Sequence, residues 1–524
     1  MTKPNIIYIY ADDLGRGMLS CYGQQHFRTP YIDRLASEGV RLTQAYGTSF
    51  CAPARASLMT GMHDAHAGRW TFTKAGVYKD YHEGKLDLMD LYELIHNTGI
   101  RPRDGQRFLA HMAREAGYVT GQIGKLEWGF STTGPELAEH GWDYHYGYYD
   151  HERCHGFYPP FLWENGDRVD IPGNTDVHCG RGHYSVFPDG TVPHDPEGRG
   201  VYSQDLFDEK ILEFLQAHRG EPFFLYHPSQ LPHGPTYYPD VYPQVADNPD
   251  LTPVEKEYAS MVLRLDETVG KILAELDGLG LADSTIVIFA ADNGHAPGYQ
   301  QLGRFLIDTD LDGNPIDQIT TKFYSDANGD VFDGNDGMAG LKCTNWEGGA
   351  KIPFVVRWPG RVAPGTVSDH LIANYDTMAS IADLLDVELD PADTDGITFL
   401  PALQGHERAT EHNHVVYASQ DGPSLVTRDG WKLRVYLRRD RILGFAQFGA
   451  HPAAIDDAVI YQLYYLPDDY REERDLAADQ PDKLHELRAL LLKECDGNLA
   501  NGTPQAHFAF YNYGYARGPG ALIE

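Results

Sequence analysis

The sequence predicts an α/β protein with a large, doubly wound, mostly parallel sheet flanked by helices, and a smaller C-terminal antiparallel sheet plus helix. Three observations lead to this prediction. Short apolar runs recur up to about residue 405, amphipathic helical patterns separate them, and closely spaced strand patterns follow. The length of 524 residues and the 42% hydrophobic content fit one large core and one smaller unit.

Five apolar runs have the composition of buried parallel strands, because each is short, rich in branched or aromatic residues and bounded by polar or turn-forming residues. They are NIIYIYADD (5–13), YVTGQIGK (118–125), PFFLYHP (222–228), STIVIFAADNG (284–294) and KIPFVVRWPG (351–360). Functional groups in such sheets gather beyond the carboxyl ends of the strands. Polar residues at those ends are therefore the first candidates for a site.

Four segments between these runs place apolar residues at helical spacing and end near glycine. They cover residues 29–40, 105–117, 202–220 and 255–280. Each lies between two predicted strands, and this alternation favours a doubly wound sheet.

The pattern changes after GITFLPALQG (396–405), where strand-like segments follow one another and are succeeded by the helical pattern DKLHELRALLLKECDG (482–497). Closely spaced strands predict antiparallel pairing. We therefore expect a catalytic domain over residues 1–405 and a C-terminal α+β subdomain over residues 406–524.

Charge and composition exclude several classes of partner. The formal net charge is −33, which argues against binding to nucleic acid or an anionic membrane, so locally positive groups become the ones to find. No run of about 18 apolar residues predicts a membrane span, and residues 1–15 lack the pattern of a signal peptide. The chain as it reads is expected in the cytoplasm, or in the periplasm or outside the cell if a leader has been removed. The six cysteines are too scattered for a disulfide framework, although Cys154 and Cys179 remain a possible pair.

Two predicted strands end in acidic pairs. Asp12 and Asp13 close the first run, and Asp292 with Asn293 closes the fourth. Adjacent carboxylates at the end of a buried strand are costly unless a cation or hydrogen bonds offset their repulsion. Four hard oxygen ligands favour calcium or magnesium over zinc or copper. A helix N-cap is the simpler alternative for one aspartate, but explains two less well.

A second acidic segment is a weaker metal candidate. Residues 308–337 form a polar insertion in which Asp308, Asp310 and Asp312 match the start of a calcium loop, but Ile319 stands where such a loop needs glutamate. A solvated loop is the favoured interpretation.

The segment FCAPARASLMTG (50–61) raises a separate question about Cys51. Pro53 and the helix formers after it predict a turn entering a helix, which places Cys51 near positive backbone dipoles. A thiolate nucleophile and a buried structural cysteine both fit this pattern.

The same segment also resembles the signature of the type I sulfatases, Cys-x-Pro-x-Arg followed by Thr-Gly, in which the cysteine is oxidised to Cα-formylglycine. Further segments are similar to the family's metal, lysine and histidine motifs. They are YADDLG (10–15), GKLEWG (124–129), LPHGP (231–235), ADNGH (291–295) and LKCTNWEGG (341–349). The resemblance covers nearly the whole chain and implies the alkaline-phosphatase-like fold.

The resemblance also implies roles for individual residues. One calcium ion would be held by the modified side chain of Cys51 together with Asp12, Asp13, Asp292 and Asn293. Arg55 would hold the hydrated aldehyde, Lys125 and Lys342 would hold sulfate oxygens, and His233 would protonate the departing alcohol. Cations aimed at sulfate oxygens and an imidazole acid suit this chemistry.

One position departs from the family pattern. The Gly-Lys motif usually has a histidine two residues after the lysine, as a candidate base for expelling sulfate, and this chain has Glu127 there. Glu127 is therefore a further catalytic candidate. Four more residues are predicted to contact substrate: His66, Arg69, His155 and His295.

The expected function is hydrolysis of a sulfate ester, with a carbohydrate as the expected substrate. The expected partners are a sulfated small molecule or oligosaccharide and a formylglycine-generating maturation enzyme. Two alternatives stay open. One is a phosphonate or phosphodiester hydrolase of the same superfamily, and the other is a non-catalytic protein that binds sulfated glycans with Cys51 unmodified.

Overall fold

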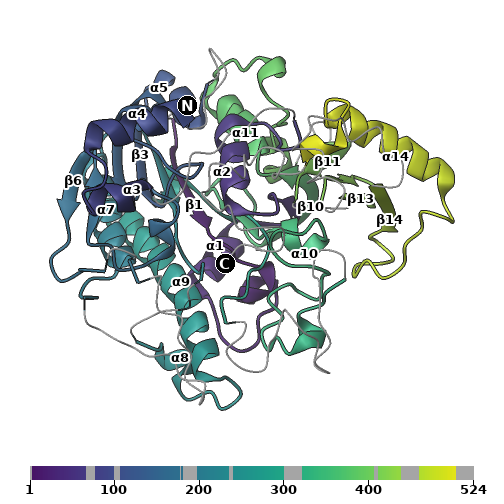
Figure 1. The fold of residues 1–524 in the computed structure, drawn as a ribbon, viewed down its shortest axis with the longest axis horizontal. Helices are drawn as coiled ribbons and strands as arrows, with labels where there is room; N and C mark the ends of the chain where they lie inside the picture. Colours follow the sequence, from purple (N-terminus) through teal and green to yellow (C-terminus); the bar gives the residue numbers. More distant parts are fainter. Residues whose placement is uncertain are drawn as a thin grey trace.

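The computed structural model describes residues 3–66, 77–98, 107–176, 179–180, 198–234, 236, 240–299, 322–405, 411–419, 421–437 and 459–502. A ten-stranded sheet forms the centre of the molecule, helices pack around it, and a four-stranded sheet lies at one end (Figure 1). This arrangement confirms the predicted fold class.

The large sheet has the strand order β10-β2-β9-β8-β1-β7-β3-β4-β5-β6. Its strands are β1 (Asn5–Ala11), β2 (Val40–Tyr46), β3 (Val119–Gly124), β4 (Tyr144–Gly147), β5 (Phe161–Glu164), β6 (Asp167–Asp170), β7 (Phe223–Pro228), β8 (Thr285–Ala291), β9 (Phe354–Arg357) and β10 (Thr366–Ala373). Strand β1 lies at the centre, is wholly buried, and pairs in parallel with both β7 and β8.

The helices of the described residues are α1 (Pro30–Glu38), α2 (Cys51–Thr60), α3 (Val77–His82), α4 (Leu88–Thr98), α5 (Leu109–Glu115), α6 (Gly134–Glu139), α7 (Ser203–Ala217), α8 (Pro243–Ala246), α9 (Pro253–Leu279), α10 (Glu347–Ala350), α11 (Asp376–Leu385), α12 (Leu400–Leu403) and α14 (Pro481–Glu494). Helices α1, α7 and α9 pack together as one group, and α2, α5 and α11 as another. None of the helices in the described part of the chain has both the length and the apolar composition of a membrane span.

All five predicted strands are present, as β1, β3, β7, β8 and β9. The expected direction of the fifth is wrong, because β9 runs antiparallel to both β2 and β8. The chain leaves β8 at its carboxyl end and re-enters the sheet at that same end, after a long excursion over residues 292–353. Residue composition cannot distinguish the two directions, since a buried strand is apolar in either.

The second sheet has the order β11-β12-β13-β14, with strands β11 (His414–Tyr417), β12 (Ser424–Thr427), β13 (Trp431–Leu437) and β14 (Val459–Tyr465). All its pairings are antiparallel, and α14 packs on β12 and β13. All six cysteines are free thiols, so Cys154 and Cys179 do not form a disulfide in this structure.

Buried ion pairs join the two sheets, and we call this group the inter-sheet cluster. Lys432 on β13 lies 2.7 Å from Glu472 and 3.1 Å from Glu347, measured between its Nζ and a carboxylate oxygen of each. Glu347 begins α10 and also pairs with Lys351 at 3.1 Å. The hydroxyl of Tyr46, at the end of β2, donates to Glu347 at 2.7 Å.

Candidate active site

The two acidic pairs meet because their strands are neighbours in register. Strand β1 pairs with β8 so that Ala11 lies opposite Ala291, which places Asp12 beside Asp292 at the carboxyl end of the sheet. The backbone amide of Asp13 donates to Asp292 Oδ1 at 3.1 Å, and Asn293 Nδ2 donates to Asp13 Oδ1 at 2.9 Å. The predicted juxtaposition of the two strand ends is present.

Three cationic side chains lie against these carboxylates. Arg55 Nη2 is 3.0 Å from Asp292 Oδ2 and 3.5 Å from Asp12 Oδ1. The ammonium of Lys125 contacts the other oxygen of Asp12. Lys342 Nζ donates to a carboxylate oxygen at the first acidic pair, Asp13 Oδ2, at 2.7 Å. Segments far apart in the sequence thus supply one compact group of opposite charges.

Burial and neighbouring charge push the two central carboxyls in opposite directions. Burial alone would raise the pKa of Asp12, but Lys125, then His233 and Arg55, hold that pKa well below its usual range. Burial and the adjacent Asp12 charge raise the pKa of Asp292 to about 8, although Arg55 opposes the rise. Asp12 is therefore ionised at neutral pH, whereas Asp292 mostly retains its proton.

The donor set fits a hard divalent cation. Among the described residues, Asp12 Oδ1 and Asn293 Oδ1 are buried oxygens with no hydrogen-bond partner. Ligand atoms of Asp12, Cys51 and Asp292 lie within 4.8 Å of one another. Buried acceptors without donors are uncommon, and oxygen ligands in this number suit calcium or magnesium.

Cys51 begins helix α2, as the sequence predicted, and every residue of that helix is buried. Arg55 follows one turn later, so both side chains lie on the same face of the helix. Gly61 ends the helix in the left-handed region, with φ of 69°. Burial raises the pKa of Cys51 to about 11, against the opposing effect of Lys125 and Lys342. The unmodified residue is thus a protonated thiol at neutral pH, which disfavours the thiolate alternative.

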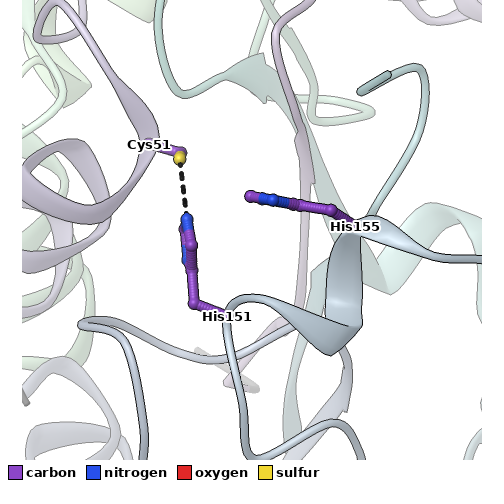
Figure 2. Close-up of side chains that lie close together, drawn as sticks. All are labelled: Cys51, His151 and His155. Atoms are coloured by element: carbon purple, nitrogen blue, oxygen red, sulfur yellow. Dashed lines mark hydrogen bonds between the residues drawn. The ribbon is translucent and has the colours of Figure 1, made fainter. Parts of the chain in front are cut away.

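Two histidines lie beside Cys51 (Figure 2). His151 Nε2 is 3.6 Å from Cys51 Sγ. His155 Nε2 is 3.1 Å from Lys125 Nζ, and the His155 ring stacks on His233 with centroids 3.8 Å apart. His155 was predicted and lies in the cluster. Sequence analysis missed His151, although the pattern His-x-x-x-His (151–155) could have indicated it.

His233 and Lys342 are the least buried members of the cluster. Their side chains are 14% and 18% exposed, whereas that of Lys125 is fully buried. His233 Nε2 lies 3.2 Å from both Lys342 Nζ and Asp13 Oδ2. Burial lowers the pKa of His233 to about 4, although the Asp13 charge opposes this. A small anion would therefore approach from the side of these two residues.

Glu127 is buried, but its hydrogen bonds among the described residues lead elsewhere. One carboxylate oxygen contacts His140, and the other accepts from Trp142 Nε1 at 2.6 Å. These described contacts of Glu127 do not include Cys51, and its predicted catalytic role stays a prediction.

Two of the predicted substrate contacts lie in other clusters, and one falls outside the described residues. His66 Nε2 lies 3.0 Å from Asp395, and its ring stacks on His63 at 4.0 Å. His295 Nε2 lies 3.0 Å from the hydroxyl of Tyr299, which donates to the carboxylate of Asp330. Arg69 lies outside the described residues.

The acidic insertion is described only from residue 322 onward, so its calcium-loop match at 308–319 also lies outside. In the described part, Asp330 accepts from the backbone amides of Phe332 and Gly334, and Asp333 accepts from that of Gly337. These carboxylates organise the loop itself.

Comparison with known proteins shows which family the chain matches. A family model described as Sulfatase matches residues 4–387. The N-acetylgalactosamine-6-O-sulfatase of Bacteroides thetaiotaomicron is 29% identical over 556 residues, covering 93% of this chain and 92% of that protein. The N-acetylgalactosamine-6-sulfatase of Homo sapiens is 30% identical over 411 residues, covering 76% of this chain and 66% of that one. A structure solved in work on the metabolism of multiple glycosaminoglycans by Bacteroides thetaiotaomicron aligns with a TM-score of 0.65 and 26% identity, over 95% of this chain and 100% of that chain.

Proposed function

This chain belongs to the sulfatase family, and on that premise we propose that it hydrolyses a sulfate ester of a carbohydrate, using a Cα-formylglycine made from Cys51 and one calcium ion. The observation that carries the proposal is the convergence, around Cys51, of two acidic strand ends and three cations, of which Arg55 and Lys125 are fully buried. An oxygen-rich cation site next to groups that bind an anion is what transfer of a sulfuryl group requires.

The calcium ion would be held by Asp12, Asp13, Asp292 and Asn293 together with the side chain made from Cys51. The two buried oxygens without a donor, Asp12 Oδ1 and Asn293 Oδ1, support this assignment. Bound there, the ion would offset the repulsion between the carboxylates and polarise an oxygen of the modified residue. The modified residue itself would supply, as an aldehyde hydrate, the nucleophilic hydroxyl.

The sulfate group would be held by the cations of the cluster. Lys342 lies on the accessible side and Lys125 is buried at the inner side, so the two can contact different oxygens of one sulfate. Arg55, one helical turn after Cys51, would hold the modified side chain. Fixed cations of this kind stabilise negative charge that develops in the transition state without having to reorganise.

His233 would protonate the departing alcohol. Its Nε2 lies between Lys342 and Asp13, on the accessible side where the ester oxygen would leave. In the protein alone, burial keeps this imidazole neutral at neutral pH. A sulfate anion bound beside it favours the protonated form, so that substrate binding itself would promote protonation of His233.

The carbohydrate part of the proposal is supported by the relatives. Two of them are named for the removal of a 6-sulfate from N-acetylgalactosamine, and one aligns over nearly the full length of both chains. Carbohydrate 6-sulfates are therefore the substrates to test first.

Two measurements test the proposed function. The first is the mass of the peptide that contains residue 51, in protein produced together with a formylglycine-generating enzyme. We expect loss of the thiol mass and gain of the aldehyde, and a persistent thiol would contradict the catalytic proposal. Sulfated-glycan binding without hydrolysis would support the non-catalytic alternative.

The second measurement compares hydrolysis of an aryl sulfate, an aryl phosphate diester and an aryl phosphonate, followed by a panel of sulfated mono- and oligosaccharides. We expect sulfate esters to be preferred, with release from one position of the sugar. Faster cleavage of the phosphonate or the phosphodiester would overturn the choice of sulfate.

A further inference from the structure

The described contacts leave one role in the proposed reaction without an occupant. After transfer, sulfate must be expelled from the side chain made from Cys51, which requires a base close to that side chain. Glu127 stands at the position where the family has its candidate histidine, yet its two oxygens contact His140 and Trp142. A residue that contacts Cys51 is therefore better placed for this step.

We propose that His151 is this catalytic base, an inference that rests on the proposed function. In Figure 2 the ring of His151 points directly at Cys51, and the distance between Nε2 and Sγ is 3.6 Å. Sγ occupies the position on Cβ that an oxygen of the modified side chain would take. An imidazole nitrogen at this distance from the sulfur is placed to accept a proton from a hydroxyl on the same carbon.

The surroundings of His151 fix its backbone and bring one aromatic ring against the imidazole. Its backbone amide donates to the carbonyl of Phe130 at 2.8 Å, and the Phe130 ring meets the imidazole edge to face at 4.7 Å. The preceding residue, Asp150, is fully buried and accepts from the backbone amides of Tyr78 at 3.2 Å and Glu152 at 2.7 Å. The backbone position that places the ring beside Cys51 is thus fixed without help from substrate.

The other imidazoles of the cluster are engaged differently. His155 Nε2 faces Lys125 Nζ, and one face of its ring is covered by His233. His233 lies on the accessible side, next to Lys342, where the leaving alcohol is expected. The geometry thus divides the two proton transfers, with donation by His233 on the outer side and acceptance by His151 beside Cys51.

In this step sulfate leaves and the aldehyde of residue 51 forms again. Before it, the Cβ of residue 51 carries one hydroxyl and one sulfate ester oxygen. Nε2 of His151 takes the hydroxyl proton, the O–H electron pair becomes the second bond of the aldehyde C=O, and the bond from Cβ to the sulfate oxygen breaks with its electron pair leaving on sulfate. Addition of water then restores the hydrate, and His151 returns its proton to solvent or to the departing sulfate.

The test uses the full chain with residue 51 converted, an aryl sulfate as probe, and acid quenching during turnover followed by mass measurement of the residue-51 peptide. For His151→Ala we expect one equivalent of aryl alcohol to be released rapidly and turnover then to fall by about 10²- to 10⁴-fold. The peptide should accumulate in the sulfated form, whereas the wild-type peptide should be mostly the free aldehyde. Added imidazole should restore part of the turnover in the alanine variant.

Three comparisons make the result decisive. His151→Gln keeps a polar side chain of similar size and should accumulate the same sulfated peptide, so it answers the question if the alanine variant does not fold. His145→Gln removes another buried histidine, which contacts Tyr149, and should follow the wild type. Glu127→Gln tests the competing assignment. Accumulation of the sulfated peptide in this variant, and not in the His151 variants, would overturn the proposal.

Failure of the inference and failure of the proposed function give different results. Converted His151 variants that turn over at the wild-type rate, without sulfated peptide, would overturn the role of His151 alone. A wild-type protein that is converted but does not cleave the aryl sulfate or any sulfated sugar would overturn the proposed function.

Discussion

Two buried charge clusters in this molecule differ in whether they reach the surface. In the inter-sheet cluster, two glutamates meet two lysines and the Tyr46 hydroxyl, and Glu472 also accepts from the backbone amide of Glu347 at 2.8 Å. These four charged side chains are at most 3% exposed, whereas in the candidate active site the side chains of His233 and Lys342 remain 14% and 18% exposed. In both clusters burial raises the pKa of one carboxyl, Glu472 or Asp292, while nearby lysines lower the pKa of its neighbour, Glu347 or Asp12.

The difference indicates what each cluster is for. A buried network with paired charges fixes the relative position of the elements that supply it, here the two sheets. A charge cluster that is open on one side can admit a ligand, and sites of function are where proteins accept a cost in stability.

The largest effect on stability is expected in the inter-sheet cluster. Lys432→Met removes the cation shared by Glu347 and Glu472 and leaves buried negative charge without its partner, which should lower the free energy of unfolding by about 3–5 kcal/mol. Denaturant unfolding measures the change. Lys493→Met, at a side chain that is 80% exposed, is the control and should have little effect. Equal stability of the two variants would show that the cluster does not hold the sheets.

The corresponding change in the site should affect activity instead. Lys342→Met removes a cation proposed to hold sulfate, and kcat/KM for an aryl sulfate should fall by about 10²- to 10³-fold. Lys85→Met, at a side chain that is 63% exposed, should retain the wild-type rate. If Lys342→Met loses stability as Lys432→Met does and keeps its activity, the two clusters do not differ in the way proposed.

Calcium binding should depend on pH because Asp292 retains its proton up to a pH of about 8. Below that pH the ion must displace the proton, so its apparent affinity should weaken by about tenfold for each unit of pH. Titration of metal-free protein with calcium at pH 6 and pH 9, followed by thermal unfolding, measures this. An equal affinity at both pH values would contradict the retention of this proton by Asp292, and Asp292→Asn should remove the pH dependence.

The smallest expected effect concerns the metal-free protein. The folded state raises the pKa of Asp292 above its usual value, so the stability contributed by this carboxyl is full at low pH and is lost as the pH rises through about 8. Asp292→Asn cannot lose a proton, so between pH 5 and pH 9 its free energy of unfolding should rise relative to that of the wild type, by about 1.4 kcal/mol for each pH unit below the folded-state pKa. Denaturant unfolding measures the difference, and an equal difference at both pH values would contradict the prediction.

The sequence predicts the framework of the site well because each feature is local. The acidic pairs follow strands that are recognisable from short apolar runs, and strand ends in a parallel sheet share one edge. Cys51 and Arg55 are four residues apart at a predicted helix start, which places both on one face. These inferences need only the strand and helix assignments.

The features that the sequence does not predict depend on how distant segments pack. His151 approaches Cys51 through a loop anchored by Asp150, and only the fold brings the two together. His295 follows the metal motif by two residues, yet its ring turns toward Tyr299. Glu127 occupies a motif position but is held by His140 and Trp142. In each case the choice of partner is made by tertiary packing over more than one element, which a motif does not encode.

The complete burial of helix α2 also limits the period in which Cys51 can be modified. The residues around Cys51 that a maturation enzyme must bind lie inside the folded protein. The modification that we propose is therefore possible only on the nascent or unfolded chain. The rate of modification thus competes with the rate of folding. Slower synthesis or delayed folding should raise the converted fraction of a preparation, and chains that fold first should keep the thiol for the rest of their lifetime.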